Sequence, residues 1–310
     1  MKIWFDCDPG IDDSVALGYA LAHPEVFDII GISGVGGNAN VNQVTENLVR
    51  LVSLLNRKDI PIYKGASKPL ARPLKDAKAV HGSTGLGLAT LPETDKQAEK
   101  ENAIVAMYNA IKNSDEKVTI IPTGPLTNIA LLLNTFEDSK DYIEQILLMG
   151  GAAVGGNATP YAEFNIYTDE VAAHTVFNSG IKMVMCGLDV TMHCGVHEDY
   201  NNLLVNSDNI IHQSCGLMMK HYIDRRIYKD DTRDGREAYI HDAVPFMYLV
   251  HPEIFDGFYA TVNVPIGEVE RRGQTQTTPC EKDDPNAVLV LNQVQSELFT
   301  KYLLDAIYTY

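Results

Sequence analysis

The sequence has no long apolar run and little positive charge. No stretch of its 310 residues approaches the roughly 20 apolar residues of a membrane helix, and the first residues carry no long apolar secretory segment. Lys and Arg number 25 against 41 Asp and Glu, a formal net charge of −16. Nucleic acids and anionic membranes both need a basic face, so we exclude them as partners and expect a neutral or cationic small molecule.

Cysteine is also scarce, and its pattern bears on the compartment. The chain has five cysteines: Cys7, Cys186, Cys194, Cys215 and Cys280. An odd, scattered set suits a reducing compartment better than a disulfide framework, so we expect a cytoplasmic protein. His193 and His197 lie near two of these cysteines and suggest zinc as an alternative, but their spacing matches no standard zinc template.

Apolar runs alternate with helical patterns along the whole chain. The predicted strands are 2–7, 26–35, 118–121, 143–149 and 183–186, and the predicted helices are 12–23, 41–55, 125–133 and 168–177, with Asn40 as an N-cap. Continuous apolar strands between helices indicate a mostly parallel twisted sheet covered on both faces. We therefore predict an open, doubly wound α/β fold in a single domain spanning residues 1–310.

Polar and glycine-rich clusters follow these predicted strands. The strand over 26–35 leads into Gly36-Gly37-Asn38, the strand over 118–121 into Thr123-Gly124-Pro125, and the strand over 143–149 into Gly150-Gly151. In parallel α/β sheets, ligands bind beyond the carboxyl ends of the strands. We expect these clusters to converge on one site.

The first predicted strand ends in an acidic run that contains Asp6, Asp8, Asp12 and Asp13. Like charges this close repel one another unless a cation or a proton compensates them. An all-oxygen donor set favours calcium or magnesium, and calcium suits a site that mixes carboxylates with carbonyls. The alternative is that Asp12 and Asp13 are only charges at the N-terminus of the following helix, where its dipole is positive, and that Asp6 or Asp8 is a capping group.

Two other acidic motifs fit less well. An EF-hand loop counted from Asp6 would place Leu17 where a bidentate Glu is required. A phosphatase motif with two strand-end aspartates would need a hydroxyl or β-branched residue where Gly10 stands.

The run, together with later motifs, resembles the nucleoside hydrolase family, in its inosine-uridine-preferring group. The resemblance covers most of the chain. The shared motifs are Asp6–Asp13, Val35–Asn38, His81–Gly87, Thr123–Ala130, Met149–Ala152, Gly156–Asn157, Ala162–Asn165, Leu188–Thr191 and His241–Asp242. Two positions depart from the family pattern: Ala243 stands where proline is usual, and Arg271–Pro279 is a looser version of a late threonine and glycine stretch.

The resemblance implies a function and a set of roles. The chain would hydrolyse the N-glycosidic bond of ribonucleosides to ribose and free base, through a transition state with positive charge on the sugar. Asp8, Asp13 and Asp242 would bind Ca²⁺ with their carboxylates and Thr123 with its carbonyl, while Asp8 would also deprotonate the attacking water and Asp6 would order the ligands. The predicted ribose contacts are Asp12, Asn38, Asn157, Glu163, Asn165 and Asp242, and Met149 is a further predicted substrate contact.

The leaving base needs a proton or a strong hydrogen-bond donor. His241 is the candidate acid, because imidazole titrates near neutral pH and the residue adjoins Asp242. His81 is expected either to contact the base or to anchor its glycine-rich loop. Residues 222–239 are rich in aromatic and charged side chains and suggest a mobile lid, in which Tyr228 would contact the base.

Three competing functions remain open at this stage. The enzyme could act on another N-ribosyl compound, such as a nicotinamide riboside, or the chain could bind nucleosides without catalysis. A phosphorylase would cleave the same bond, but an acid-lined site would repel phosphate. The family resemblance also implies a homodimer or homotetramer.

Overall fold

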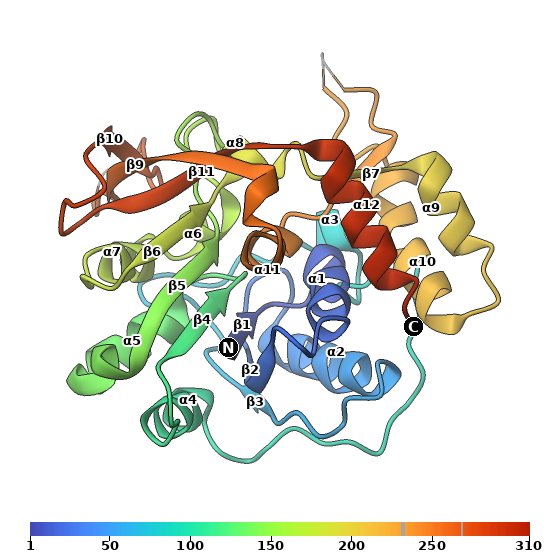
Figure 1. Ribbon diagram of the computed structural model, residues 1–310, viewed down its shortest axis with the longest axis horizontal. Coiled ribbons are helices and arrows are strands. Elements are labelled where there is room, and N and C mark those ends of the chain that lie inside the picture. The colour runs from blue at the N-terminus through green and yellow to red at the C-terminus, as the bar shows by residue number, and fades with distance from the viewer. Residues whose placement is uncertain (231–232, 268) are drawn as a thin grey trace.

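A computed structural model describes residues 1–230, 233–267 and 269–310 (Figure 1). The strands are β1 (Lys2–Cys7), β2 (Asp28–Gly34), β3 (Ile62–Lys64), β4 (Val118–Pro122), β5 (Ile143–Met149), β6 (Met183–Cys186), β7 (Gly195–His197), β8 (Glu237–Tyr239), β9 (Phe255–Asn263), β10 (Gln276–Pro279) and β11 (Val288–Val294). The helices are α1 (Ile11–Leu21), α2 (Val41–Leu54), α3 (Lys78–His81), α4 (Ala103–Lys112), α5 (Thr127–Thr135), α6 (Phe164–Thr168), α7 (Glu170–Phe177), α8 (Leu188–Thr191), α9 (Glu198–Val205), α10 (Ile210–Asp224), α11 (Ala243–Val250) and α12 (Ser296–Ile307). Two 3₁₀ helices, η1 (Glu137–Tyr142) and η2 (Pro252–Ile254), complete the elements.

One large sheet organises the described residues. Its nine strands run in the order β10-β9-β11-β6-β5-β4-β1-β2-β3, and β7 pairs with β8 in a separate small sheet. Every neighbouring pair from β11 to β3 is parallel, whereas β9 runs antiparallel to both β11 and β10. The predicted mostly parallel sheet is confirmed.

The interior strand β1 shows that both faces of the sheet are covered. Ile3, Phe5 and Cys7 pack into the core beneath α1, α2, α11 and α12, while Trp4 packs into the core beneath α4, α5 and α7. Side chains alternate along a strand, so a strand buried on both faces must be apolar throughout. The continuous apolar run in the sequence therefore corresponds to the doubly covered arrangement in Figure 1.

Most predicted elements occur close to their expected bounds. The Asn40 side chain caps α2 as expected, because its oxygen accepts a hydrogen bond from Gln43 N at 3.2 Å. The helix predicted over 168–177 is wrong at its start. Asp169 (φ −138°) separates α6 from α7 and caps α7 by accepting from Ala172 N at 3.1 Å. Periodicity alone could not detect this break.

The parallel strands bring the polar clusters to one edge of the sheet. Since β1, β2, β4, β5 and β6 point the same way, the segments after them lie at the same edge, as predicted. None of the helices in the described ranges is both long and apolar enough to cross a membrane.

Candidate active site

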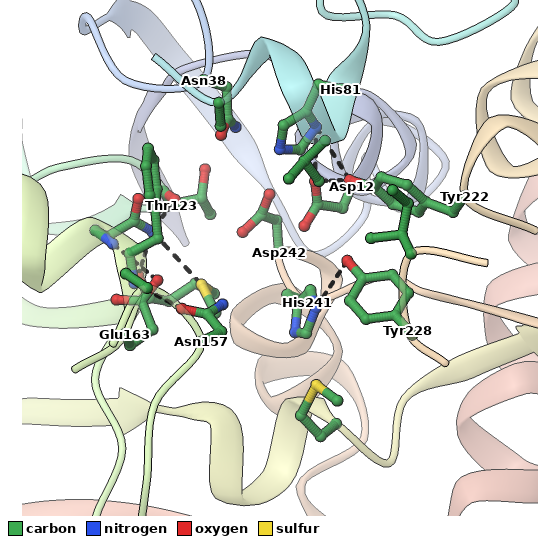
Figure 2. Close-up of a pocket in the computed structure, with 18 of the residues that line it drawn as sticks. Asp12, Asn38, His81, Thr123, Asn157, Glu163, Tyr222, Tyr228, His241 and Asp242 are labelled. Carbon is green, nitrogen blue, oxygen red and sulfur yellow. Dashed lines mark hydrogen bonds and ion pairs between the residues drawn. The ribbon is translucent and has the colours of Figure 1, made fainter. Parts of the chain in front are cut away.

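A cavity of about 390 Å³ opens at the carboxyl edge of the sheet (Figure 2). It is lined by most residues that the sequence predicted for the site: Asp12, Asn38, His81, Thr123, Met149, Asn157, Glu163, Asn165, Tyr228, His241 and Asp242. Figure 2 shows Thr123, Asn157 and Glu163 on one side of it and Tyr222 and Tyr228 on the other, with Asp242 between them. Asp8 and Asp13 are buried and do not line the cavity.

The acidic residues of the cavity and beneath it are almost completely buried. Asp13 Oδ1 accepts from Thr123 Oγ1 at 2.7 Å, and its Oδ2 accepts from Gly10 N at 3.0 Å. Asp13 therefore accepts from the N-cap residue of α1, where the alternative interpretation expected only a helix-end charge, and also belongs to the carboxylate group. Asp8 Oδ2 accepts from Asn38 N at 2.7 Å, whereas Asp8 Oδ1 is buried without a hydrogen-bond partner among the described residues.

Three carboxylates come close enough to share a metal ion. Oxygens of Asp12, Asp13 and Asp242 all lie within 4.8 Å of one another. The predicted ligand set contained Asp8 in place of Asp12. Asp8 adjoins this group, because its backbone N donates to Asp13 Oδ1 at 3.3 Å. The predicted carbonyl ligand, Thr123 O, accepts from Asn165 Nδ2 at 2.7 Å.

The electrostatics of this group favour a cation. Burial, reinforced by the neighbouring carboxylates, raises the pKa of Asp8 and Asp242 well above the ordinary range of an aspartate. Burial, followed by the charge of Asp13, raises the pKa of Asp12 to about 7. A divalent ion would offset both the desolvation and the repulsion, and an all-oxygen site suits a hard cation. The cluster fits a metal ion.

Asp6 lies in the buried support of this group. Its Oδ1 accepts from Asn128 Nδ2 at 2.7 Å and from the Ser33 hydroxyl. Burial raises the pKa of Asp6 to about 7, against the opposing effect of these hydrogen bonds. The residue lines no part of the cavity, which agrees with the predicted supporting position.

His81 ends the short helix α3, whereas the sequence suggested a glycine-rich loop. Its Nδ1 accepts from Ile11 N at 3.2 Å and lies 3.0 Å from the Tyr222 hydroxyl. An accepting Nδ1 leaves the proton of a neutral ring on Nε2. Burial, followed by the charge of His241, lowers the pKa of His81 to about 3, so the ring is neutral. His81 thus both anchors α3 on α1 and presents a donor.

His241 lies between two hydroxyl groups. Its Nδ1 is 2.8 Å from Thr191 Oγ1, and its Nε2 is 3.2 Å from Tyr228 Oη. Burial lowers the pKa of His241 to about 4. The Tyr228 ring makes edge contacts with the rings of Tyr222 and Tyr239, which fixes an aromatic wall beside the imidazole.

The opposite wall is built on the N-terminus of α6. The Glu163 carboxylate caps this helix, accepting from Asn165 N and Ile166 N, and its Oε2 also accepts from Gly151 N at 3.0 Å. Burial raises the pKa of Glu163 to about 7. Asn157 Oδ1 accepts from Phe164 N at 2.9 Å, which leaves its amide N–H groups for a ligand.

Several lining residues were absent from the predicted site. Val80, Phe164, Met192 and Ile227 line the cavity, but each is apolar and carries no chemical signal in the sequence. Tyr222 was predicted only as part of a lid, yet its hydroxyl donates to Asp12 Oδ1 at 3.1 Å and the residue is 1% exposed. Of the predicted lid, residues 231 and 232 lie outside the described residues, and closure stays a prediction.

The zinc alternative finds no support in the structure. Cys186 and Cys194 are buried free thiols, and Cys194 Sγ donates to Val190 O at 3.5 Å. Within the described ranges, the aspartate cluster is the one group of three or more potential ligand side chains close enough to hold a metal.

Solved structures with the same architecture are ribonucleoside hydrolases. The chain superposes on the purine-preferring ribonucleoside hydrolase from Gardnerella vaginalis with a TM-score of 0.90 at 28% identity, covering 100% of this chain and 98% of that one. A plant nucleoside hydrolase gives a TM-score of 0.89 at 27% identity, covering 99% and 98%. The fold and its acidic cavity define an N-glycosidase of the nucleoside hydrolase class.

The sequence comparisons are more specific. The model of the inosine-uridine preferring nucleoside hydrolases matches residues 3–301. The pyrimidine-specific ribonucleoside hydrolase RihA of Shewanella sp. strain MR-4 is 38% identical over 310 residues, covering 99% of this chain and 96% of that protein. The chain belongs to the inosine-uridine preferring nucleoside hydrolase family, which confirms the resemblance seen in the sequence.

Proposed function

We propose that this enzyme hydrolyses ribonucleosides with Ca²⁺ as its cofactor and Asp8 as its general base. The observation that carries the proposal is the cluster of buried carboxylates at the bottom of the cavity. In this cluster, Asp8 Oδ1 has no hydrogen-bond partner among the described residues. Asp8, Asp13 and Asp242 would hold the ion together with the Thr123 carbonyl. A bound Ca²⁺ supplies positive charge that lowers the pKa of nearby water.

Asp8 is held to accept a proton. The hydrogen bond from Asn38 N fixes one carboxylate oxygen, and none of the described residues hydrogen-bonds to Oδ1. In the proposed reaction, water attacks C1′ of the ribose and its proton passes to Asp8. The bond between C1′ and the base nitrogen breaks with its electron pair on the base, which leaves with a hydrogen bond from His241 and then takes up a proton from solvent. Neighbouring carboxylates stabilise the positive charge that develops on the sugar.

In this proposal, one wall of the cavity binds the ribose and the other binds the base. We assign the ribose hydroxyls to Asp12, Asn38, Asn157, Glu163, Asn165 and Asp242, with Met149 as a further contact. The base would lie against His81, Tyr228 and His241. The buried, neutral His241 ring offers the departing base a hydrogen-bond donor.

We further propose that pyrimidine ribonucleosides are preferred. The support is that similar proteins are named pyrimidine-specific ribonucleoside hydrolases, including the RihA of Shewanella oneidensis, which is 43% identical over 255 residues. Initial rates with uridine, cytidine, inosine, adenosine and nicotinamide riboside, followed by release of reducing sugar, test the preference. Faster turnover of inosine than of uridine would reverse it.

The Asp8→Asn variant tests the general base. It keeps the size of the side chain and removes the basic oxygen, so kcat is expected to fall by about 10²–10⁴-fold. Asp115→Asn is the matched control, because the Asp115 side chain is exposed and forms a surface ion pair with Lys2. Full turnover by Asp8→Asn would contradict the assignment.

Three further properties belong to the same proposal. Residues 1–310 form one catalytic domain, the enzyme assembles as a homodimer or homotetramer, and it acts in the cytoplasm. The five free cysteines are consistent with a reducing compartment. Light scattering of the purified enzyme tests the assembly.

A further inference from the structure

The short helix α8 lies between two walls of the cavity: the ribose wall, which contains Asn157 and Glu163, and the base wall, which contains Tyr228 and His241. It belongs to neither wall. It follows β6 directly and is joined to the ribose wall at its first residue, where Leu188 N donates to Gly151 O at 2.9 Å. Its sequence, Leu188-Asp189-Val190-Thr191, is one of the shared motifs, yet none of its residues lines the cavity. The motif therefore needs an explanation other than contact with the substrate.

Asp189 faces the ribose wall. Its Oδ2 accepts from Ala153 N at 2.7 Å, and its Oδ1 accepts from Val154 N at 3.0 Å. The same loop donates Gly151 N to Glu163 Oε2 at 3.0 Å and leads into Asn157. A charged acceptor that holds two consecutive peptide N–H groups fixes the loop that positions the proposed ribose contacts.

Thr191 faces the base side. It is 0% exposed, and its Oγ1 lies 2.8 Å from His241 Nδ1. A neutral imidazole has one donor and one acceptor nitrogen. A hydroxyl that donates to Nδ1 therefore leaves the ring proton on Nε2, the nitrogen that faces the Tyr228 hydroxyl at 3.2 Å. The reverse arrangement would leave Nε2 without a proton to give.

We propose that α8 is a positioning element for both walls: Asp189 holds the ribose-binding loop, and Thr191 holds His241 in the tautomer that donates from Nε2. The role given to Thr191 rests on the function proposed above for His241. Both side chains act through other residues and touch no substrate. They should therefore affect different kinetic constants, although only one residue separates them in the chain.

The test compares two substrates with different leaving groups. Uridine needs help in releasing its base, whereas p-nitrophenyl β-D-ribofuranoside releases a stable phenolate without a proton. Thr191→Val is expected to lower kcat for uridine roughly ten- to hundredfold and to leave the KM for uridine nearly unchanged. Turnover of the p-nitrophenyl riboside should also stay nearly unchanged. Thr191→Ser keeps the hydroxyl and should restore most of the lost rate.

Asp189→Asn should give the opposite result. Its amide keeps one acceptor oxygen and turns its NH2 group toward the other peptide N–H, so one of the two hydrogen bonds is lost, the loop shifts and KM rises roughly tenfold for both substrates. Thr45→Val is the matched control, because Thr45 is a buried threonine whose hydroxyl donates only to Val41 O in α2. Equal losses on both substrates for Thr191→Val, or no rescue by Thr191→Ser, would overturn the proposal.

A measurement on the wild-type enzyme covers the case in which a variant fails to fold. The ¹⁵N spectrum of histidine-labelled enzyme, with His241 assigned by comparison with His241→Gln, reports which ring nitrogen carries the proton. We expect Nε2–H, and an Nδ1–H ring would refute the assignment to Thr191. Wild-type enzyme that cleaves no ribonucleoside would instead contradict the proposed function, so the two failures are distinguishable.

Discussion

Replacing Gly37 by alanine should inactivate the enzyme through Asp8. A Cβ built on Gly37 would lie 1.9 Å from Asp8 Oδ2 and 2.8 Å from Pro125 Cδ. To restore an ordinary contact, the carboxylate or the backbone must move by roughly 1.5 Å. Either movement breaks the 2.7 Å hydrogen bond from Asn38 N that holds Asp8.

The expected loss follows from this displacement. A misplacement of about 1 Å can cost 10²-fold in rate, so kcat/KM for Gly37→Ala should fall at least about a hundredfold. Overpacking should lower the free energy of unfolding by about 1–3 kcal/mol, which leaves a chain of this size folded. The assays are ribose release at varied uridine concentration and urea unfolding followed by circular dichroism.

Gly18→Ala is the matched control for the same substitution. Gly18 lies within α1, and a Cβ there would meet nothing within 4 Å. Alanine in a helix interior should raise the free energy of unfolding by about 0.5–1 kcal/mol and leave kcat/KM unchanged. A folded Gly37→Ala enzyme as active as Gly18→Ala would refute the requirement for this position of Asp8.

Three other predictions test the cofactor, the base wall and the core. Removing calcium with a chelator should abolish turnover and lower the melting temperature, because repulsion among the buried carboxylates is no longer offset. Added Ca²⁺ should restore both. Turnover that a chelator leaves intact would contradict the calcium proposal. Tyr228→Phe removes the hydroxyl 3.2 Å from His241 Nε2 and should lower kcat for uridine about three- to tenfold. An unchanged kcat would refute the assignment of the Tyr228 hydroxyl to the base site. Phe246→Ala should cost about 3–5 kcal/mol in urea unfolding, because the fully buried Phe246 ring packs edge-on against Phe5 and Phe27; a cost below about 1 kcal/mol would mean that the core collapses around the gap.

The sequence was sufficient to predict the order of the main elements. The apolar run from Ile3 to Cys7 and the stripe along Val41–Leu54 are local periodicities, which a strand and a helix express wherever they lie in the fold. The helix start at Glu170 was missed, because it depends on one hydrogen bond made by Asp169.

The sequence also indicated the chemistry proposed for the site, since clustered aspartates and strand-end glycines are visible without coordinates. It could not decide how distant side chains meet. Tyr222 bonds to Asp12 across 210 positions, and Thr191 bonds to His241 from a different element. Such pairs are set by the order of strands in the sheet and by the packing of helices on it, because neighbours in space need not be neighbours in the chain. Only the tertiary structure showed that Asp12 joins Asp13 and Asp242, and that Asp8 lies beneath the cavity with one oxygen that no described residue hydrogen-bonds.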